Sequence, residues 1–206
     1  MARVKLTKTE LKAQTDALKR FNRFLPMLQL KKQQLQAEIA GIVAKADAVS
    51  VRERALRAEV DRWVGLLATG GDALDGLVEL KGVRRGTANI AGVTIPTFES
   101  VETATREVDA WATPAWVDAA VEAAKQMISL RCEREVYDEQ RRLVAEELQQ
   151  TSQRVNLFEK VRIPECKEAI RLIKIAIGDE QTAAITRGKI AKGRTVGEAS
   201  EETEAA

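Results

Sequence analysis

The amino-acid sequence predicts an all-α-dominated protein: a long antiparallel two-helix coiled coil with a short β-hairpin and a glycine-rich region at the middle of the chain. Three observations lead to this fold class. Charged residues make up 31% of the 206 residues and aromatic residues only 4%, a composition that suits narrow helix–helix seams better than a broad globular core. Apolar residues repeat every seven positions in the first third of the chain. Glycines concentrate in the middle, where they exclude a long helix.

Composition also excludes several classes of function. The chain contains no histidine, so it has no His-based catalytic triad and no His metal site. Its two cysteines, Cys132 and Cys166, form no CxxC pair, and we expect both to be packing residues in a reduced chain. No apolar run approaches the ~20 residues that cross a bilayer, and the N-terminal stretch lacks the apolar core of a signal peptide. We therefore expect no catalytic residue, no metal site, no cofactor and no membrane insertion.

The first coiled-coil helix is expected within residues 1–67. The capping box "TKTE", which begins at Thr7, predicts where it starts. Two apolar rows, three residues apart, then repeat with the seven-residue period of a coiled coil. Pro26 should bend this helix, and Lys32 and Glu53 interrupt the apolar rows. The seam residues predicted from this helix are Leu18, Phe21, Leu28, Leu35, Ile39, Ile42, Val49, Leu56 and Trp63.

Residues 68–112 form a glycine-rich middle in which we expect a β-hairpin. Two β-prone stretches, "LVELKGVRRG" and "ANIAGVTIPTFE", are separated by turn residues. Pro96 should lie at an edge or at a strand end, because it cannot donate a ladder hydrogen bond. A chain that goes out and comes back places this hairpin at the far tip of the paired helices. The candidate partner-binding or regulatory residues of the hairpin are Val83, Asn89, Gly92, Val93 and Pro96.

The second coiled-coil helix is expected over residues 113–195, followed by an acidic tail, 196–206, that we expect to be disordered. Thr113 as N-cap and Pro114 at the first helical position predict its start. Pro164 interrupts its apolar pattern. Either the helix continues through a kink, which we favour, or one helix ends before Pro164 and another begins there. This helix adds Val144, Leu148, Val155 and Phe158 to the predicted seam.

Two charged segments allow more than one interpretation. The first mixes acidic and basic residues, which indicates a solvated helix face with pairs four residues apart. Its members are Arg131, Glu133, Arg134, Glu135, Asp138, Glu139, Arg141 and Arg142. The second, "TRGKIAKGR" at residues 186–194, has four positive charges and no aromatic residue. It fits a frayed, solvated helix end, a contact with an acidic protein surface, or salt-dependent nucleic-acid binding.

Four stretches, in order along the chain, resemble the D subunit of the V/A-type ATPases and ATP synthases. They are "LTKTEL", "MLQLKKQQL", "NIAGVTIPTFE" and "RVNLFEKVRIP", and we take the resemblance to cover roughly residues 5–195. Each stretch alone is moderately specific, whereas their order on a helix–hairpin–helix plan is much more so. The last stretch supplies the family-like motif Arg154, Val155, Asn156, Ile163 and Pro164.

The resemblance implies a non-catalytic component: the central rotor shaft that couples ATP hydrolysis or synthesis in a head of A and B subunits to ion translocation through the membrane sector. It also implies two further partners, the F subunit and the C/d subunit above the membrane ring, and a cytoplasmic position peripheral to the membrane. The two chain ends would form the rotor tip inside the head. The tip residues expected to contact the head are Leu6, Lys8, Leu11, Lys12, Arg187, Lys189 and Lys192.

Two other hypotheses compete with this one. A structural coiled-coil tether or scaffold unrelated to an ATPase explains the seven-residue repeat equally well, but leaves "RVNLFEKVRIP" and the glycine-rich hairpin unexplained. A nucleic-acid-binding helical protein would use the basic N-terminal segment, since residues 1–35 carry nine Lys/Arg against two acidic residues. We expect no nucleic-acid partner. The direction of ATP turnover and the choice between H⁺ and Na⁺ stay open, because ion choice belongs to the membrane ring.

Overall fold

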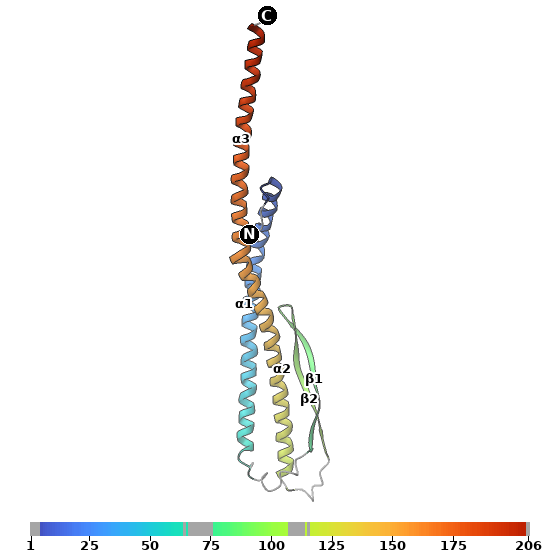
Figure 1. Cartoon of the computed structure of the whole chain (residues 1–206). Helices are drawn as coiled ribbons and strands as arrows, with labels where there is room; N and C mark the ends of the chain where they lie inside the picture. The colour runs from blue at the N-terminus through green and yellow to red at the C-terminus, as the bar shows by residue number, and fades with distance from the viewer. Residues whose placement is uncertain (1–4, 64, 66–75, 107–113, 115, 205–206) are drawn as a thin grey trace. The chain divides into compact units, whose positions relative to one another are not determined.

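Long helices dominate the chain, with one small sheet between them in the sequence. A computed structural model describes residues 5–63, 65, 76–106, 114 and 116–204, with residues 193–204 as backbone only. This architecture confirms the predicted fold class (Figure 1). The elements, in order, are α1 (Lys8–Val60), β1 (Val78–Ile90), β2 (Val93–Thr105), α2 (Trp116–Leu157), the π-helical turn η3 (Phe158–Arg162) and α3 (Ile163–Glu204).

The chain packs into two compact units. The central unit comprises Leu30–Ser152, and the terminal unit comprises Met1–Gln29 together with Gln153–Ala206. The central unit therefore contains the later part of α1, the hairpin and most of α2. The terminal unit contains the first part of α1, the end of α2, η3 and α3.

In the central unit, α1 and α2 run antiparallel. Lys31 pairs with Glu147 at 2.6 Å, and Arg52 pairs with Glu133 at 3.0 Å. Residue numbers therefore rise along α1 as they fall along α2. On α1, the buried side chains are spaced by seven residues, which keeps them on the single face that α2 covers. These residues are Leu35, Ile42 and Val49.

The β-hairpin closes with a two-residue turn. β1 pairs with β2 antiparallel as far as Ile90 and Val93, which leaves Ala91 and Gly92 between them. Both turn residues have positive φ, 50° at Ala91 and 87° at Gly92, as a type I′ turn requires. The Gly92 amide donates a hydrogen bond to Asn89 Oδ1 at 3.0 Å. The turn residues thus set the register of the sheet.

The expectation that the hairpin stands at the far tip of the paired helices is wrong. In the central unit the hairpin folds back along α2 (Figure 1), and Ile95 of β2 is buried in one cluster with Leu35, Ile42 and Val144. The physical reason is that a two-stranded hairpin is marginally stable alone. Its apolar face is buried only if it lies on the helices.

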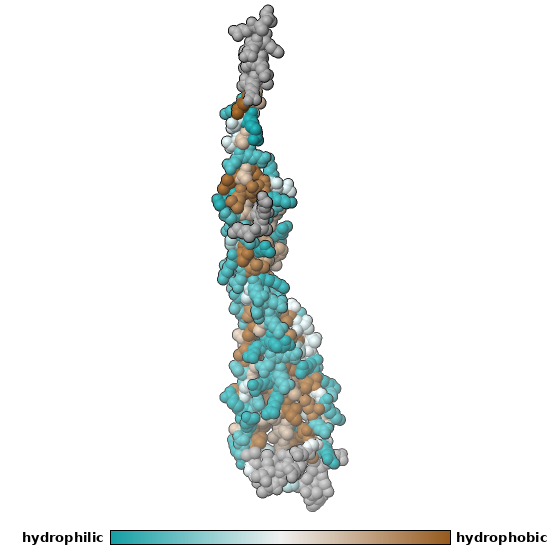
Figure 2. Space-filling model, viewed as in Figure 1, coloured by the Kyte–Doolittle hydropathy of each residue, from teal (hydrophilic) through white to brown (hydrophobic). Residues whose placement is uncertain are grey.

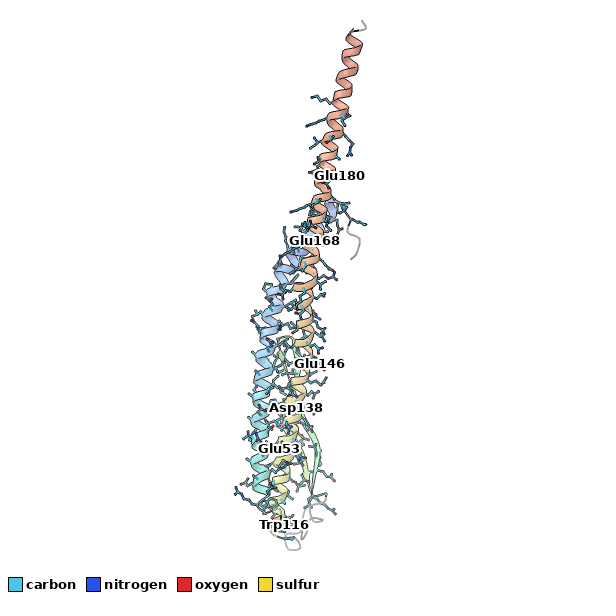
Figure 3. All side chains as sticks on the ribbon, turned by 60° about the vertical axis from the view of Figure 1, so that its left-hand side comes forward. Glu53, Trp116, Asp138, Glu146, Glu168 and Glu180 are labelled. Atoms are coloured by element: carbon cyan, nitrogen blue, oxygen red, sulfur yellow. The ribbon has the colours of Figure 1, made fainter. Side chains whose placement is uncertain are left out.

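In the terminal unit, the first part of α1 lies beside η3 and α3 (Figures 1 and 3). Phe21 and Phe158 stack with ring centroids 5.0 Å apart and planes tilted by 47°, a favourable aromatic geometry. Toward the chain end, buried residues follow one another at three- or four-residue steps, which marks a single narrow helical face. They are Ile163, Cys166, Ala169 and Ile173.

The start of α1 contains half of the predicted capping box. The Glu10 amide donates to Thr7 Oγ1 at 3.3 Å, as expected for an N-cap. The Glu10 carboxylate instead accepts a hydrogen bond from Gln14 Nε2 at 2.8 Å. Thr7 therefore caps the helix without the reciprocal contact from Glu10 in this structure.

The backbone stays helical on both sides of Pro164. Ile163 has φ −67° and ψ −48°, and its amide donates to the carbonyl of Phe158, five residues back. A regular α-helical turn would press the Pro164 ring against the carbonyl of Lys160. The structure has a wider π turn just before the proline, which the sequence did not predict. Single π turns of this kind occur inside α-helices, and this one lets the helix continue past Pro164.

The observed helix bounds differ from those expected. α1 ends at Val60, before the expected end at residue 67, and Pro26 lies inside it without ending it. α2 begins at Trp116, and the predicted N-cap Thr113 lies outside the described residues. α3 continues to Glu204, into the tail for which the sequence predicts disorder.

Candidate functional site

The described residues contain no group of three or more Asp, Glu or Cys side chains arranged to hold a metal ion. A surface groove of ≈ 430 Å³ lies between α1 and α2 in the central unit. Two of its three charged residues, Arg52 and Glu133, bind each other through two hydrogen bonds of 3.0 and 3.1 Å. The full lining is Arg52, Ala55, Leu56, Glu59, Gln126, Ser129, Leu130 and Glu133.

The two cysteines are packing residues rather than nucleophiles. Both are free and buried. Burial raises the pKa of the Cys132 thiol, and the neighbouring Glu135 carboxylate raises it further. Burial also raises the pKa of the Cys166 thiol, with Glu165 adding to the effect. A reactive cysteine needs the opposite shift, because the thiolate is the nucleophile.

None of the seam residues predicted from the sequence is exposed. The buried ones are Leu35, Ile42, Val49, Val144 and Val155, and the half-buried ones are Leu18, Phe21, Leu28, Ile39, Leu56, Trp63, Leu148 and Phe158. Glu53, which interrupts the apolar row, has only 14% of its side chain exposed. Its carboxylate is paired with Arg131 at 3.7 Å and with Arg134 at 3.3 Å. A charge inside the seam is thus neutralised by the facing helix.

The sequence predicted that the charged residues of α2 form a solvated face with pairs inside the helix. Some of them instead bind other elements of the fold. Some pairs lie within α2, such as Arg134–Asp138 and Arg142–Glu146. Others cross to different elements: Glu133 binds Arg52 of α1, and Glu139 binds Arg85 of β1 at 3.0 Å. Sequence reasoning missed these cross-element partners, because a helix pattern alone does not say which distant residue lies opposite. The one signal available was the charged residue in the apolar row of α1.

The predicted hairpin residues divide into packed and exposed ones. Val83, Val93 and Pro96 are half-buried, whereas Asn89 and Gly92 are exposed at the turn. The Pro96 carbonyl accepts a hydrogen bond from Gln140 Nε2 of α2. Pro96 lies within β2, and each strand of a two-stranded sheet is an edge strand, where proline is tolerated. A partner that reaches the hairpin turn would therefore meet Asn89 and Gly92.

The family-like motif lies around the π turn of the terminal unit. Val155 and Ile163 are buried, while Arg154, Asn156 and Pro164 are exposed. The apolar members of the motif therefore pack the terminal unit. The exposed members lie on its surface, where they are available to a partner.

The two groups of predicted tip residues are not at one level. Leu6, Lys8 and Lys12 are exposed and Leu11 is half-buried at the start of α1. We compare how far each helix extends from the Phe21–Phe158 contact. At a rise of 1.5 Å per residue, Arg187 lies about 24 Å farther along the axis from this contact than Lys8 does. Figure 1 shows α3 continuing past the start of α1. The residues of α3 beyond the start of α1 therefore have no second helix beside them in the described structure.

This single-helix part of α3 is the strongest candidate for an interaction surface. All residues from 178 to 192 are exposed, including the basic Arg187, Lys189 and Lys192. Ile185 and Ile190 are 61% and 54% exposed, and apolar side chains reach the surface along α3 (Figure 2). An isolated helix of this kind is marginally stable in water, and exposed apolar residues beside basic ones are typical of a surface that another protein covers.

No helix of the described residues is both long and apolar enough to cross a membrane.

The sequence profile of the ATP synthase D subunit family matches residues 10–193 of the chain. The V-type ATP synthase D subunit of Borreliella burgdorferi is 42% identical over 196 residues, which cover 95% of this chain and 96% of that protein. The V-type ATP synthase D subunits of Chlamydia felis and Chlamydia pneumoniae are 30% and 32% identical, over 207 and 194 residues. These matches cover 100% and 92% of this chain, and 99% and 91% of the two relatives.

Proposed function

The chain belongs to the ATP synthase D subunit family, and we infer from this membership that it is the central rotor shaft of a V/A-type ATPase or ATP synthase. In that role it couples ATP hydrolysis or synthesis in the catalytic head to ion translocation through the membrane sector. The observation that carries this inference is the match across residues 10–193, which includes both long helices and the hairpin. The alternative of an unrelated coiled-coil tether is not favoured, because it does not account for that match.

The chain acts as a component of a larger complex, and we propose that it carries no active site of its own. Within the described residues the thiols are buried and have raised pKa values, and the charged face of α2 is occupied by ion pairs to other elements. A shaft needs such permanent contacts between its helices, because torque is transmitted only through parts that keep their positions.

The proposed head contact is made by the exposed part of α3 together with the basic start of α1. Arg187, Lys189 and Lys192 supply positive charge, and Ile185 and Ile190 supply apolar surface. The expected acceptors are acidic and apolar side chains on the inner wall formed by the A and B subunits. Contacts that must be broken and remade during rotation suit exposed charges, since each surface ion pair contributes roughly 0–1 kcal/mol.

Family membership supports two further proposals about partners. We propose that the F subunit binds the middle of the paired helices and the hairpin, where Asn89 and Gly92 are exposed. We propose that the C/d subunit, above the membrane ring, is the base on which the shaft is mounted. The chain would then lie on the cytoplasmic side, peripheral to the membrane.

The test is co-purification with the head and a matched pair of variants. A tag on the A subunit of the same cells should recover this chain together with the B and F subunits at moderate salt. The tip variant Arg187→Gln, Lys189→Gln, Lys192→Gln should lower the rate of ATP-driven ion transport by severalfold. The control Lys45→Gln, Arg57→Gln, Arg62→Gln removes three exposed charges of the central unit and should leave transport unchanged.

Absence of this chain from the purified head would contradict the rotor assignment and return the tether hypothesis to the front. Equal rates of ion transport in the tip variant and its control would contradict the proposed head contact but not the rotor assignment.

A further inference from the structure

The apolar seam of the central unit does not by itself define one register of α1 against α2. Its buried residues on α1 are three aliphatic side chains seven residues apart, Leu35, Ile42 and Val49. A slip of α2 by one heptad, about 10 Å along the axis, would again place the inner face of α2 opposite this row, with Tyr137 or Thr151 in the place of Val144. Repeating seams of this kind need a polar element to specify register.

Glu53 is such an element. It stands in the apolar row, only 14% of its side chain is exposed, and its two carboxylate oxygens are shared between Arg131 and Arg134 of α2. The adjacent residue, Arg52, holds Glu133 with two hydrogen bonds. Figure 3 shows Glu53 on α1 and Asp138 on the neighbouring α2, with Asp138 farther along the helix pair. Two consecutive residues of α1 are therefore tied to one turn of α2.

Either slip of one heptad would disrupt this contact. Moved one way, α2 would bring Ala124 and Met127 opposite Glu53, and a half-buried carboxylate would face apolar side chains. Moved the other way, Asp138 and Arg141 would come opposite, so one of the two partners would repel it. A buried charge without a partner is strongly destabilising.

The same slips would also break the other cross-helix pairs. Arg52 would face Gln126 after one slip and Gln140 after the other, and neither glutamine carries a charge. Lys31, which pairs with Glu147 at 2.6 Å, would lose that partner in both cases. The ion pairs therefore distinguish the native register from its two neighbours.

We propose that Glu53, paired with Arg131 and Arg134 and flanked by Arg52–Glu133, is a register lock that holds α1 and α2 in a single axial alignment. The lock acts by making the two neighbouring registers unfavourable rather than by adding stability to the native one. It concerns the pairing of the chain's own helices and stands whether or not the chain is a rotor.

The experiment measures register directly. Spin labels are attached at Lys45→Cys and Gln149→Cys, two exposed positions of the central unit, in a chain whose native cysteines are changed to alanine. A slip of one heptad changes their axial separation by about 10 Å, which pulsed electron resonance resolves. The parent chain should show one distance.

The variant Glu53→Leu restores an aliphatic residue to the row. Its helix content and thermal midpoint should be retained, and a second distance population should appear. Retained helix content with the single parent distance would overturn the proposal and leave the hairpin and apolar packing to define register. If the leucine variant aggregates, the isosteric Glu53→Gln replaces it. A second distance population in this variant would support the proposal, and the single parent distance would overturn it.

Glu146→Leu, which breaks an exposed pair within α2, is the matched control and should keep one distance.

Discussion

The central and terminal units are built from the same two helical arms but are stabilised differently. In the central unit three elements meet, and Ile95 of the hairpin closes a cluster with Leu35, Ile42 and Val144. Ion pairs there join α1 to α2 and the hairpin to α2. In the terminal unit, η3 and α3 carry the pairs Arg162–Glu165 and Arg171–Glu168, each within three residues of one helical path.

The two units also differ in how far their apolar residues are buried. The central unit buries the cluster of Leu35, Ile42, Ile95 and Val144 by its own packing, although Leu30, Val51 and Leu80 are 50–56% exposed. The terminal unit buries one narrow face and leaves Leu172, Ile175, Ile185 and Ile190 between 44% and 61% exposed. We propose that a partner covers the exposed apolar surface of the terminal unit.

The largest expected effect breaks the core of the central unit. Leu35 and Ile173 both have no exposed surface, Leu35 in the central unit and Ile173 in the terminal unit. Leu35→Ala should lower the free energy of unfolding by about 2–5 kcal/mol, because it leaves a cavity in the cluster shared by three elements. Urea unfolding followed by circular dichroism measures the change.

Ile173→Ala is the matched variant of the terminal unit. It should leave the main unfolding transition in place and accelerate amide exchange only in residues near Ile173, because narrow seams open locally. If both variants shift one common transition by the same amount, the two units unfold together and the proposed difference between them is contradicted.

A smaller effect is expected at the hairpin turn, which belongs to the central unit. Gly92 has φ 87° and Ala91 has φ 50°, so Gly92→Ala should cost about 1 kcal/mol of stability while Ala91→Gly should be neutral or stabilising. Urea unfolding followed by circular dichroism measures both changes. A stabilising Gly92→Ala together with a destabilising Ala91→Gly would mean that the turn is not type I′ in solution.

The two buried thiols compare the units within one molecule. Cys132 lies in the central unit and Cys166 in the terminal unit, and both are 7% exposed. Because burial raises the pKa of both thiols, alkylation at pH 8 requires local opening. We expect Cys166 to react about tenfold faster, as the terminal unit opens at lower free energy. Mass spectrometry of alkylated peptides gives both rates, and a faster Cys132 would reverse the ranking of the units.

The same thiols predict a small loss of stability in alkali. Below a pH of about 8.5 the thiols are protonated in both the folded and the unfolded chain, so they contribute nothing. Above it, the unfolded thiols ionise first because the pKa of each is raised in the folded state, and the free energy of unfolding falls. Replacing both Cys132 and Cys166 by alanine should flatten this decline, and an unchanged slope would exclude the thiols as its cause.

Periodicity predicted much of the fold. The seven-residue repeat placed Leu35, Ile42 and Val49 on one face, since helix geometry is local and a buried face follows from spacing. The hairpin was also predictable, because β-prone residues flank a turn that ends in Gly92. Both features depend on residues that are near one another in the sequence.

Features that depend on distant pairing could not be predicted. The partners of Glu53 are Arg131 and Arg134, and only the relative alignment of the two helices brings them together. The position of the hairpin on α2 depends on the same long-range geometry. The π turn before Pro164 avoids a clash between the proline ring and the carbonyl of Lys160. A kink or a break between two helices would avoid it as well, and the sequence left these two alternatives open.

The central claim is that the chain is a shaft whose central unit is self-sufficient and whose terminal helix is completed by the ATPase head. Hydrogen exchange of the free chain and of the assembled ATPase tests it most directly. The account predicts that amides of residues 178–192 exchange rapidly in the free chain and slowly in the assembly, while those around Leu35 and Val144 are protected in both. Equally rapid exchange of residues 178–192 in the assembly would contradict it.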